Sequence, residues 1–439
     1  MVKILIKSPK KVKKNLYHPN TNKLVAFYGL NPVIKFCQRC TYSNQKPNSE
    51  KEYKHKLNTK KPSLKLDKKN ICNACNIQNY KSKIDWKKRE DQLKKLCDKH
   101  RKKDGSYDCL VPGSGGKDSF YTSYKLKYEY GMNPLTITYA PHIYTDWGYK
   151  NFKSWIDTGF DNFLFTPNTK VHRLLTRLAL ENLFHPFQPF MFGQNYLTPK
   201  LAVKKFNINL VFYGESPLEY GNDDNKNSPI KNPKYYTSNN PFDTSIAGIS
   251  IIKLIKDFNL KKSDLESYLP ISTKDFKKSP TEIHYLGYYI PWHPQAAYYY
   301  AVEKGGFKPS PERTPGTYSK YSSIDDKIDD LHYYTTYIKF GMGRATYDSS
   351  QEIRNDEITR QEGIKLVSQF DGEYPTRFEN ELFEYLSMDQ KNFPRAHKLF
   401  ENPIMTKKYF IKLTDKFRSP HIWMIKNGKW QLRKTIYND

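Results

Sequence analysis

The sequence has 439 residues, with 73 Lys and Arg against 45 Asp and Glu, which gives a formal net charge of +28. This length is ample for two or three units with buried cores, and a hydrophobic content of 37% with 27% charged residues excludes a membrane-embedded or disordered chain. Six cysteines in so long a chain exclude a disulfide scaffold. The longest apolar run near the N-terminus, Ile4–Ile6, is too short for a signal peptide or a spanning helix, so we expect a cytoplasmic protein.

The positive charge is concentrated at the front of the chain. Residues 1–105 hold 29 basic and 8 acidic side chains, a net charge of +21, whereas the remaining 334 residues carry only +7. An excess of this size favours an anionic partner such as nucleic acid. The abundance of Lys, Asn, Tyr and Ile is also what an AT-rich coding sequence produces, so both explanations stay open for this region.

The N-terminal quarter is predicted to contain two units. Residues 1–30 have no clear period and are interpreted as a basic extension, and residues 31–105 as a cysteine-bearing module. Within this module, apolar residues at roughly helical spacing predict a helix from Asp85 to Lys103, which ends before a glycine.

Residues 106–300 are predicted to form an α/β domain. Short apolar runs alternate with helix-length segments, which is the pattern of a parallel sheet with crossover helices. The predicted strands are 109–111, 135–138, 163–165 and 210–213, and the predicted helices lie near 119–130, 149–158 and 169–184.

The last part of the chain, residues 301–439, is predicted to be mostly helical. A stretch rich in Asn, Pro, Ser and Lys at 222–245 is expected to form a long loop. The aromatic residues of 285–300 follow it in a mostly helical pattern, and we interpret them as core packing. Two helix starts have the capping-box form, a hydroxyl residue followed three positions later by an acid, at Ser323–Asp326 and Thr359–Glu362.

The most informative segment is Val111–Ser119, Val-Pro-Gly-Ser-Gly-Gly-Lys-Asp-Ser, which follows a predicted strand and opens a predicted helix. A glycine loop in this position turns backbone N–H groups towards an anion, and the helix N-terminus adds favourable partial charge. Lys117 can neutralise phosphate oxygens, and Ser114 and Ser119 can donate hydrogen bonds to them. The segment is not a Walker A loop, because Asp118 stands where Ser or Thr is required. The alternative interpretation is a Gly/Ser turn that caps a helix.

Four cysteines form two Cys-x-x-Cys pairs separated by 31 residues. Four thiolates satisfy the tetrahedral coordination of a structural Zn²⁺. The gap is longer than the roughly 15–20 residues of common zinc ribbons, so the intervening loop must be elaborated. Disulfides are disfavoured in a cytosolic chain, and a redox pair needs a βαβ context that the first pair lacks. The predicted zinc ligands are Cys37, Cys40, Cys72 and Cys75, whereas Cys97 and Cys109 are interpreted as buried thiols.

Several segments carry a resemblance to known families. The stretch Ser-Gly-Gly-Lys-Asp-Ser at 114–119 resembles the PP-loop of the N-type ATP pyrophosphatases, which split ATP between the α- and β-phosphates. Six further segments are similar to the N-acetyl sugar amidotransferases of O-antigen and of pseudaminic or legionaminic acid pathways. They are Tyr139–Asp146, His185–Gln194, Tyr213–Asn222, Gly316–Asp326, Lys339–Arg344 and Asp371–Glu373.

This resemblance extends from about Lys35 to about residue 400 and includes the cysteine pairs. The N-terminal extension and the Lys-rich stretch of the cysteine module depart from the family pattern. The resemblance implies the PP-loop ATP pyrophosphatase fold, which is adenine nucleotide alpha hydrolase-like. It also implies that ATP, with Mg²⁺, activates the acetamido oxygen of a nucleotide-linked sugar and that ammonia then displaces AMP to leave an acetamidino group. Neither Cys97 nor Cys109 has the glycine-flanked setting of a glutaminase nucleophile, so we expect no fused glutaminase and expect ammonia from a separate glutaminase subunit through a cyclase-like subunit.

The resemblance also implies roles for single residues. Glu215, at the end of a predicted strand, is expected to bind Mg²⁺ or handle a proton, and the alternative is a buried hydrogen-bonded acid. For Asp118, Asp325 and Asp326, the alternative role is helix capping. For Lys339 and Arg344, the alternative is a solvated surface charge. The predicted catalytic residues are Lys117, Asp118 and Glu215. The predicted ATP-binding residues are Gly113, Ser114, Gly115, Gly116, Lys117, Asp118, Ser119 and Tyr139. The substrate or phosphate candidates are Asp325, Asp326, Lys339 and Arg344.

Two other hypotheses use the basic N-terminal quarter. In the first, the chain is a PP-loop enzyme that modifies tRNA, for example by thiolation, and the zinc module binds the RNA. The absence of any cysteine after Cys109 weighs against sulfur chemistry of that kind. In the second, residues 1–105 form a docking module that recruits the glutaminase and cyclase-like subunits.

Overall fold

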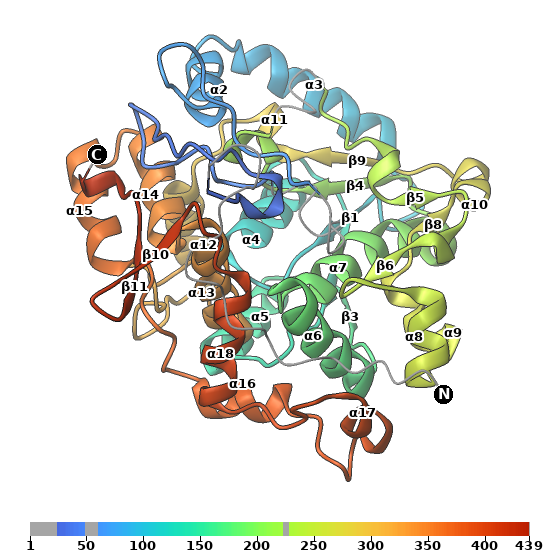
Figure 1. Ribbon diagram of the computed structural model, residues 1–439. Coiled ribbons are helices and arrows are strands. Elements are labelled where there is room, and N and C mark those ends of the chain that lie inside the picture. Colours follow the sequence, from blue (N-terminus) through green and yellow to red (C-terminus); the bar gives the residue numbers. More distant parts are fainter. Residues whose placement is uncertain (1–23, 49–59, 223–227, 439) are drawn as a thin grey trace.

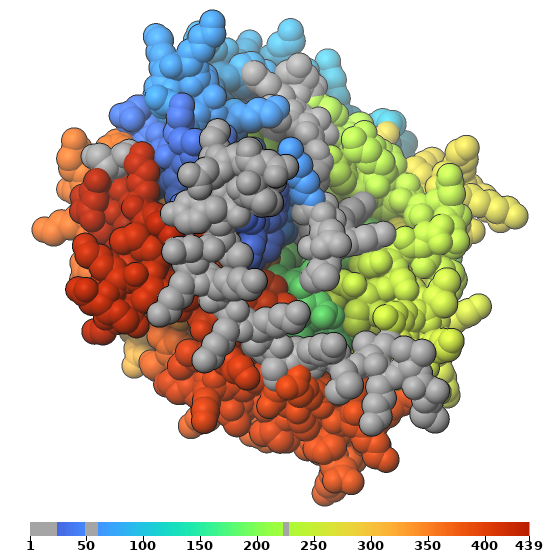
Figure 2. Space-filling model, viewed as in Figure 1, coloured from blue at the N-terminus to red at the C-terminus, as the bar shows by residue number. Residues whose placement is uncertain are grey.

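The computed structural model describes residues 24–48, 60–222 and 228–438 (Figure 1). Most of the predicted N-terminal extension lies outside these ranges. Within them, a parallel sheet with crossover helices is preceded by a four-cysteine cluster and followed by a mostly helical C-terminal region, as the sequence predicts. In the space-filling view the blue cysteine module meets both the red C-terminal surface and the green α/β surface (Figure 2). None of the described helices combines the length and apolarity that a membrane crossing requires.

The sheet has five parallel strands in the order β3-β2-β1-β4-β9. The central strands β1 and β4 are nearly continuous buried apolar runs, which is typical of a parallel sheet covered on both faces. The four predicted strands are confirmed. The fifth, β9, lies where we expected a mostly helical pattern, and that expectation is wrong at this point. The strands are β1 Cys109–Pro112, β2 Pro134–Tyr139, β3 Asn162–Phe165, β4 Leu210–Tyr213 and β9 Glu282–Tyr285.

Alternate residues of the strands face two different cores. Leu110 and Val211 pack on one face against α6 and α7, whereas Val111 and Phe212 pack on the other face in a cluster that includes Leu93 of α3. Cys97 and Cys109 belong to this second cluster, which confirms their interpretation as buried thiols. The helices around the sheet are α3 Trp86–His100, α4 Lys117–Tyr124, α5 Asp146–Asp157, α6 Thr169–Leu183, α7 Gln188–Leu201 and α12 Pro294–Gly305, and π-helical turns Lys125–Glu129 and Ala202–Phe206 extend α4 and α7.

The C-terminal region has its own aromatic core, into which Phe184 at the end of α6 inserts beside Phe410 and Phe417. The capping box at Thr359–Glu362 is confirmed at the start of α15. The one at Ser323–Asp326 is wrong, because α13 begins only at Ile328 and Ser323 has a positive φ of 52°. The elements are α13 Ile328–Phe340, α14 Arg344–Arg354, α15 Arg360–Phe370, α16 Glu379–Leu386, α17 Pro394–Leu399, α18 Lys407–Phe417, β10 Trp423–Lys426 and β11 Lys429–Leu432.

Short elements complete the described chain. The described part of the predicted loop at 222–245 contains only single 3-10 turns and two-residue strands. Of the aromatic residues between 285 and 300, Tyr285, Tyr289 and Trp292 are buried as expected, whereas Tyr299 is exposed. The remaining helices and strands are α2 Asn73–Lys81, α8 Ile251–Phe258, α9 Lys262–Leu265, α10 Thr273–Lys278, α11 Leu286–Tyr289, β5 Thr237–Ser238, β6 Ser245–Ile246, β7 Ile249–Ser250 and β8 Ile271–Ser272. The 3-10 turns are η1 Phe27–Gly29, η4 Pro217–Tyr220, η5 Pro233–Tyr235, η6 Pro241–Asp243, η7 Glu266–Tyr268 and η8 Ile436–Asn438.

Candidate active site

The glycine loop (Gly113–Gly116) connects β1 to α4, whose first residue is Lys117. Gly115 has a φ of +86°, and a Cβ atom there would lie 2.5 Å from the Cα atom of Phe152 in α5. A Cβ atom on Gly113 would lie 2.1 Å from the Cβ atom of Ser119. The close packing of the loop against two helices therefore requires glycine at both positions.

The loop forms one wall of a cavity of about 350 Å³, which we call the loop cavity. The N-terminus of α4 opens onto it, and this end of a helix attracts anions. The opposite wall comes from the C-terminal region, from the segment before α13 and from one face of α14. The polar and charged lining residues include Ser114, Lys117, Asp118, Asn151, Glu215, Tyr220, Ser322, Ser323, Asp325, Tyr333, Arg344 and Gln351.

Glu215 follows β4 and lies against the loop. Its Oε2 atom accepts a hydrogen bond from the Tyr220 hydroxyl at 2.7 Å, and its Oε1 atom accepts one from Gln351 Nε2 at 3.2 Å. Burial, together with the negative charge of Asp118, raises the pKa of Glu215 to about 7. The pocket thus holds a carboxyl group that changes protonation near neutral pH.

Two cations face the cavity from opposite walls. Lys117 is buried, and its Nζ atom contacts the Asp118 carboxylate at 2.6 Å. Arg344 begins α14, donates from Nη1 to the Tyr333 hydroxyl at 2.6 Å and lies 2.8 Å from the Asp348 carboxylate. Burial lowers the pKa of Arg344, but the combined effect of the acidic and phenolic groups around it, Asp348 foremost, outweighs burial and the net shift is upwards. Arg344 therefore stays charged, and the two side chains suit a polyphosphate.

Asp325, in the segment before α13, also lines the loop cavity. Burial raises the pKa of its carboxyl group, and a contact with Ser114 offsets part of that rise. The cavity thus brings together Ser114, Gly115, Gly116, Lys117, Asp118, Glu215, Asp325 and Arg344 of the predicted site residues.

The other predicted residues do not line the loop cavity. Gly113 and Ser119 support the loop from behind, since the Ser119 hydroxyl donates to the carbonyl of Gly116 at 2.9 Å. The ring of Tyr139 is buried against Gly193 and Phe190. Asp326 accepts hydrogen bonds from the backbone N–H groups at 142 and 143, so its side chain ties the C-terminal region to the segment after β2. Lys339 lines a neighbouring cavity of about 200 Å³, which Arg344 also reaches.

The sequence did not single out Tyr220, Tyr333 or Gln351 as site residues. One signal was available for Gln351, because it follows Arg344 by seven residues and thus shares its face of α14. A signal was also available for Tyr220, which lies in the family-like segment Tyr213–Asn222, whereas Tyr333 carries no comparable pattern. They reach the cavity only because η4 and α13 pack beside the loop.

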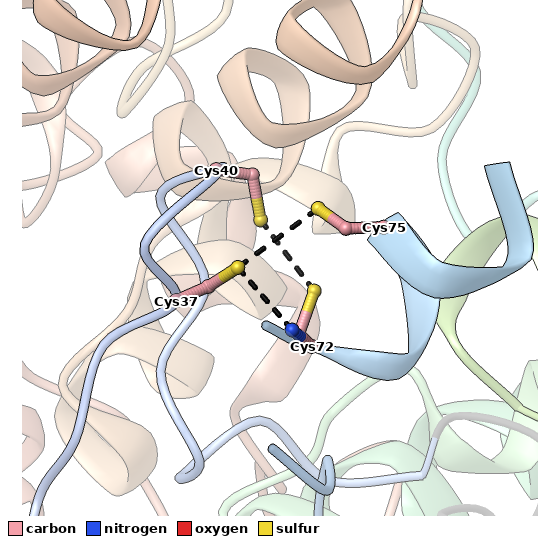
Figure 3. Close-up of side chains that lie close together, drawn as sticks. All are labelled: Cys37, Cys40, Cys72 and Cys75. Atoms are coloured by element: carbon pink, nitrogen blue, oxygen red, sulfur yellow. Dashed lines mark hydrogen bonds between the residues drawn. The ribbon is translucent and has the colours of Figure 1, made fainter. Parts of the chain in front are cut away.

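The cysteine cluster has the geometry of a tetrahedral zinc site (Figure 3). All four Sγ atoms are buried and lie within 4.8 Å of one another, with 3.9 Å between Cys37 and Cys75 and 3.6 Å between Cys40 and Cys72. Zinc–sulfur bonds of about 2.3 Å in a tetrahedron place sulfur atoms roughly 3.8 Å apart, so the four thiols fit this ion. Backbone N–H groups of Arg39 and Cys72 donate to Cys37 Sγ and would stabilise a thiolate there.

The cysteine module contacts two elements that line the loop cavity. The Thr41 hydroxyl forms hydrogen bonds with the carbonyl of Thr346 and with the hydroxyls of Ser349 and Ser350, all in α14. Helix α2 packs on η4, where Lys81 pairs with Glu219 at 2.7 Å. The module therefore holds in place the two elements that supply Gln351 and Tyr220.

Residues 315–437 match a protein family described as LPS biosynthesis protein WbpG-like, C-terminal domain. The C-terminal region is thus similar to this domain. The match begins before Asp325 and includes α13 and α14, so the WbpG-like region supplies the wall of the loop cavity that faces the glycine loop. No curated protein matches the chain significantly.

Proposed function

We propose that the chain is an ATP-dependent amidotransferase of surface polysaccharide biosynthesis. It would convert the acetamido group of a nucleotide-linked N-acetyl sugar into an acetamidino group and release AMP and pyrophosphate. The observation that carries this proposal is the composition of the loop cavity. One wall is a Ser-Gly-Gly-Lys-Asp-Ser loop, and the other belongs to a region that matches a family named for LPS biosynthesis.

The loop cavity has the charges that ATP needs. Lys117 and Arg344 would neutralise phosphate oxygens from two sides, and the N-terminus of α4 offers oriented N–H groups. Such fixed donors stabilise the charge that develops as pyrophosphate leaves.

Mg²⁺ fits the same cavity. The carboxylates of Asp118 and Asp325 both line it, and hard oxygen donors of this kind, completed by phosphates and water, suit the ion. When bound, Mg²⁺ would neutralise the charge of the phosphates.

The proposed reaction has two steps, adenylation of the amide oxygen and displacement of AMP by ammonia. The acetamido oxygen attacks the α-phosphorus of ATP, the bond to the β-phosphate oxygen breaks, and an O-adenylated imidate forms with release of pyrophosphate. Ammonia then adds to the imidate carbon and loses a proton as AMP departs with the former amide oxygen. An amide oxygen leaves poorly and AMP leaves well, which is why ATP is spent on this exchange. The loop cavity would hold the first step, with Tyr220 and Gln351 keeping Glu215 in position beside the reacting groups.

Ammonia would come from partner proteins under this proposal. A separate glutaminase subunit and a cyclase-like subunit would deliver it, and the basic N-terminal module is one candidate for docking them. Charge removal at Lys87, Lys94 and Lys95, exposed lysines of α3, is then expected to lower glutamine-dependent turnover and spare ammonia-dependent turnover. Loss of both activities would instead fit the contacts of the module with α14 and η4.

A direct assay tests the proposed function. The protein is incubated with ATP, Mg²⁺, ammonium chloride and a panel of UDP-, GDP- and CMP-linked acetamido sugars. AMP and pyrophosphate should appear only with a sugar substrate, and the product should have an NH group in place of one oxygen. Lys117→Met should remove AMP formation, whereas Lys150→Met, an exposed lysine of α5, should leave it unchanged. Formation of ADP, or AMP release that ignores every sugar, would contradict the proposal.

The basic surface of α3 favours one alternative, a PP-loop enzyme that modifies tRNA. The exposed side chains of this helix include Lys87, Lys88, Lys94, Lys95 and Lys99. Filter binding to tRNA across a salt series tests it, because many phosphate contacts give a steep loss of affinity with salt. Equal, weak binding to any polyanion would count against this alternative.

A further inference from the structure

We propose that a second cavity, beside the loop cavity, binds the acetamido sugar; this assignment rests on the proposed function. The β4–β9 cavity has a volume of about 350 Å³ and lies where β4 and β9 end, between α7 and η4. In open α/β sheets, ligands bind beyond the carboxyl ends of the parallel strands. This cavity therefore lies on the binding edge of the sheet, one strand away from the glycine loop.

The two cavities share a wall. Glu215 and Tyr220 line both of them and are joined by the 2.7 Å hydrogen bond between the tyrosine hydroxyl and the carboxylate. A reaction between two bound substrates requires their reacting atoms to meet at close range. A sugar in the β4–β9 cavity would present its acetamido group to ATP across this shared wall.

The lining of the β4–β9 cavity suits a carbohydrate. Gln194, Asn195 and Asn222 bring amide groups that can both donate to and accept from hydroxyls. The Gln194 side chain makes no hydrogen bond to any part of the described chain, so its amide is available to a ligand. The rings of Tyr213 and Tyr285, 6.3 Å apart, supply apolar surface for the C–H face of a sugar ring. A few convergent polar groups on an aromatic lining are the usual composition of a small-molecule site.

The same cavity contains a cation that suits the phosphate of a sugar nucleotide. Lys231 Nζ lies 2.5 Å from Asn195 Oδ1 and 5.4 Å from the centre of the Tyr213 ring. Its position is therefore fixed by an amide and an aromatic face. A lysine held in this way pairs well with a phosphate group as a point charge.

The competing location is the 200 Å³ cavity that Lys339 lines. It has a little more than half the volume of the β4–β9 cavity, and its walls include Phe184, Phe340 and Tyr347. It touches Tyr220 but not Glu215 or the glycine loop. The larger, amide-lined cavity is the better fit for a nucleotide-linked sugar.

Steady-state kinetics on two cavity variants test the assignment. Gln194→Ala should raise the KM for the sugar about three- to tenfold, as expected for one neutral hydrogen bond, and Lys231→Met should raise it about 10- to 100-fold, as expected for a charged one. The KM for ATP should change by less than about twofold in both variants if the shared machinery is intact. Lys234→Met, at an exposed lysine three residues from Lys231, is the matched control and should change neither value.

Each outcome decides between the two proposals. If the wild-type protein converts a sugar of the panel but both variants keep its KM, the site assignment is overturned while the proposed function stands. A rise in sugar KM in Thr336→Val, a variant of the smaller cavity, would then place the sugar there. If the wild-type protein releases AMP with no member of the panel, the proposed function fails, and the assignment of the β4–β9 cavity fails with it.

Discussion

The glycine loop offers the sharpest test of the site, because its two adjacent glycines differ in what a methyl group would meet. At Gly115 the backbone is left-handed, with a φ of +86°, and a Cβ atom would lie 2.5 Å from the Cα atom of Phe152. At Gly116, φ is −68° and the nearest atom within 4 Å of a new Cβ is Ser114 Oγ, at 3.8 Å. Gly115→Ala should therefore damage the loop, and Gly116→Ala should not.

The expected loss of stability in Gly115→Ala has two causes, the left-handed backbone and the overpacking against Phe152. A left-handed non-glycine residue costs about 1–2 kcal/mol, and overpacking against backbone atoms costs about 1–3 kcal/mol more, so Gly115→Ala should lose about 2–5 kcal/mol of unfolding free energy. An unfolding entropy of about 2.1 cal/mol/K per residue amounts to roughly 0.9 kcal/mol/K for a chain of this length, so Tm should fall by about 2–5 °C.

Thermal unfolding and ATP binding, measured on both variants, make the comparison. Gly115→Ala should lower Tm by that amount and weaken ATP binding, because the loop N–H groups lose their alignment. Gly116→Ala should keep Tm within about 1 °C of the wild-type value, in line with an uncrowded substitution. Equal Tm losses in the two variants, or a stable Gly115→Ala protein with unchanged ATP affinity, would refute the argument that Gly115 fixes the loop.

Three further predictions concern the rest of the molecule. Cys75→Ser should lose the bound zinc, because apparent zinc binding of about 10–16 kcal/mol rests on four ligands. Metal analysis should find about one zinc per wild-type chain and none in this variant. The control variant Cys97→Ser should retain the zinc. Thr41→Val removes the hydroxyl that contacts three partners in α14, so it should lower the unfolding free energy by about 1–3 kcal/mol. It should also slow AMP formation while zinc stays bound. Unchanged turnover would contradict the idea that the cysteine module positions α14. Burial raises the pKa of Glu352 to about 7, so the folded protein holds this proton more tightly than the unfolded chain. That stabilisation is complete below the ordinary pKa of about 4.5 and is lost as the pH rises through 7. In denaturant titrations, the unfolding free energy of the wild type relative to that of Glu352→Gln should therefore fall by up to about 3 kcal/mol over this range. A difference that does not depend on pH would contradict the raised pKa of Glu352.

The fold was largely accessible to pattern analysis. The strands Cys109–Pro112 and Leu210–Tyr213 are short apolar runs between helix-length segments, and that alternation has few structural solutions. Strand β9 was not predicted because Glu282–Tyr285 alternates polar and apolar residues, so it has no apolar run like those of β1 and β4, and it leads directly into a helical turn.

Only one wall of the candidate site could be predicted from the sequence, the wall formed by the glycine loop and Glu215. The loop and Glu215 follow strands of one sheet, so their proximity could be predicted from topology. The opposite wall depends on how the C-terminal helices pack, and a tertiary contact such as that between Gln351 and Glu215 has no local signature. Tyr139 illustrates the converse: it directly ends a strand, but its side chain faces the core, because alternate residues of a strand point to opposite faces.

The most direct test of the proposed reaction follows one oxygen atom. A substrate sugar identified in the panel assay is prepared with oxygen-18 in its acetamido carbonyl and incubated with the protein, ATP, Mg²⁺ and ammonium chloride. If the amide oxygen attacks the α-phosphorus, the label must leave with that phosphorus, and mass spectrometry should find it in AMP and not in pyrophosphate or the acetamidino sugar. Label that stays in the sugar, or AMP formed without label, would contradict adenylation of the acetamido group.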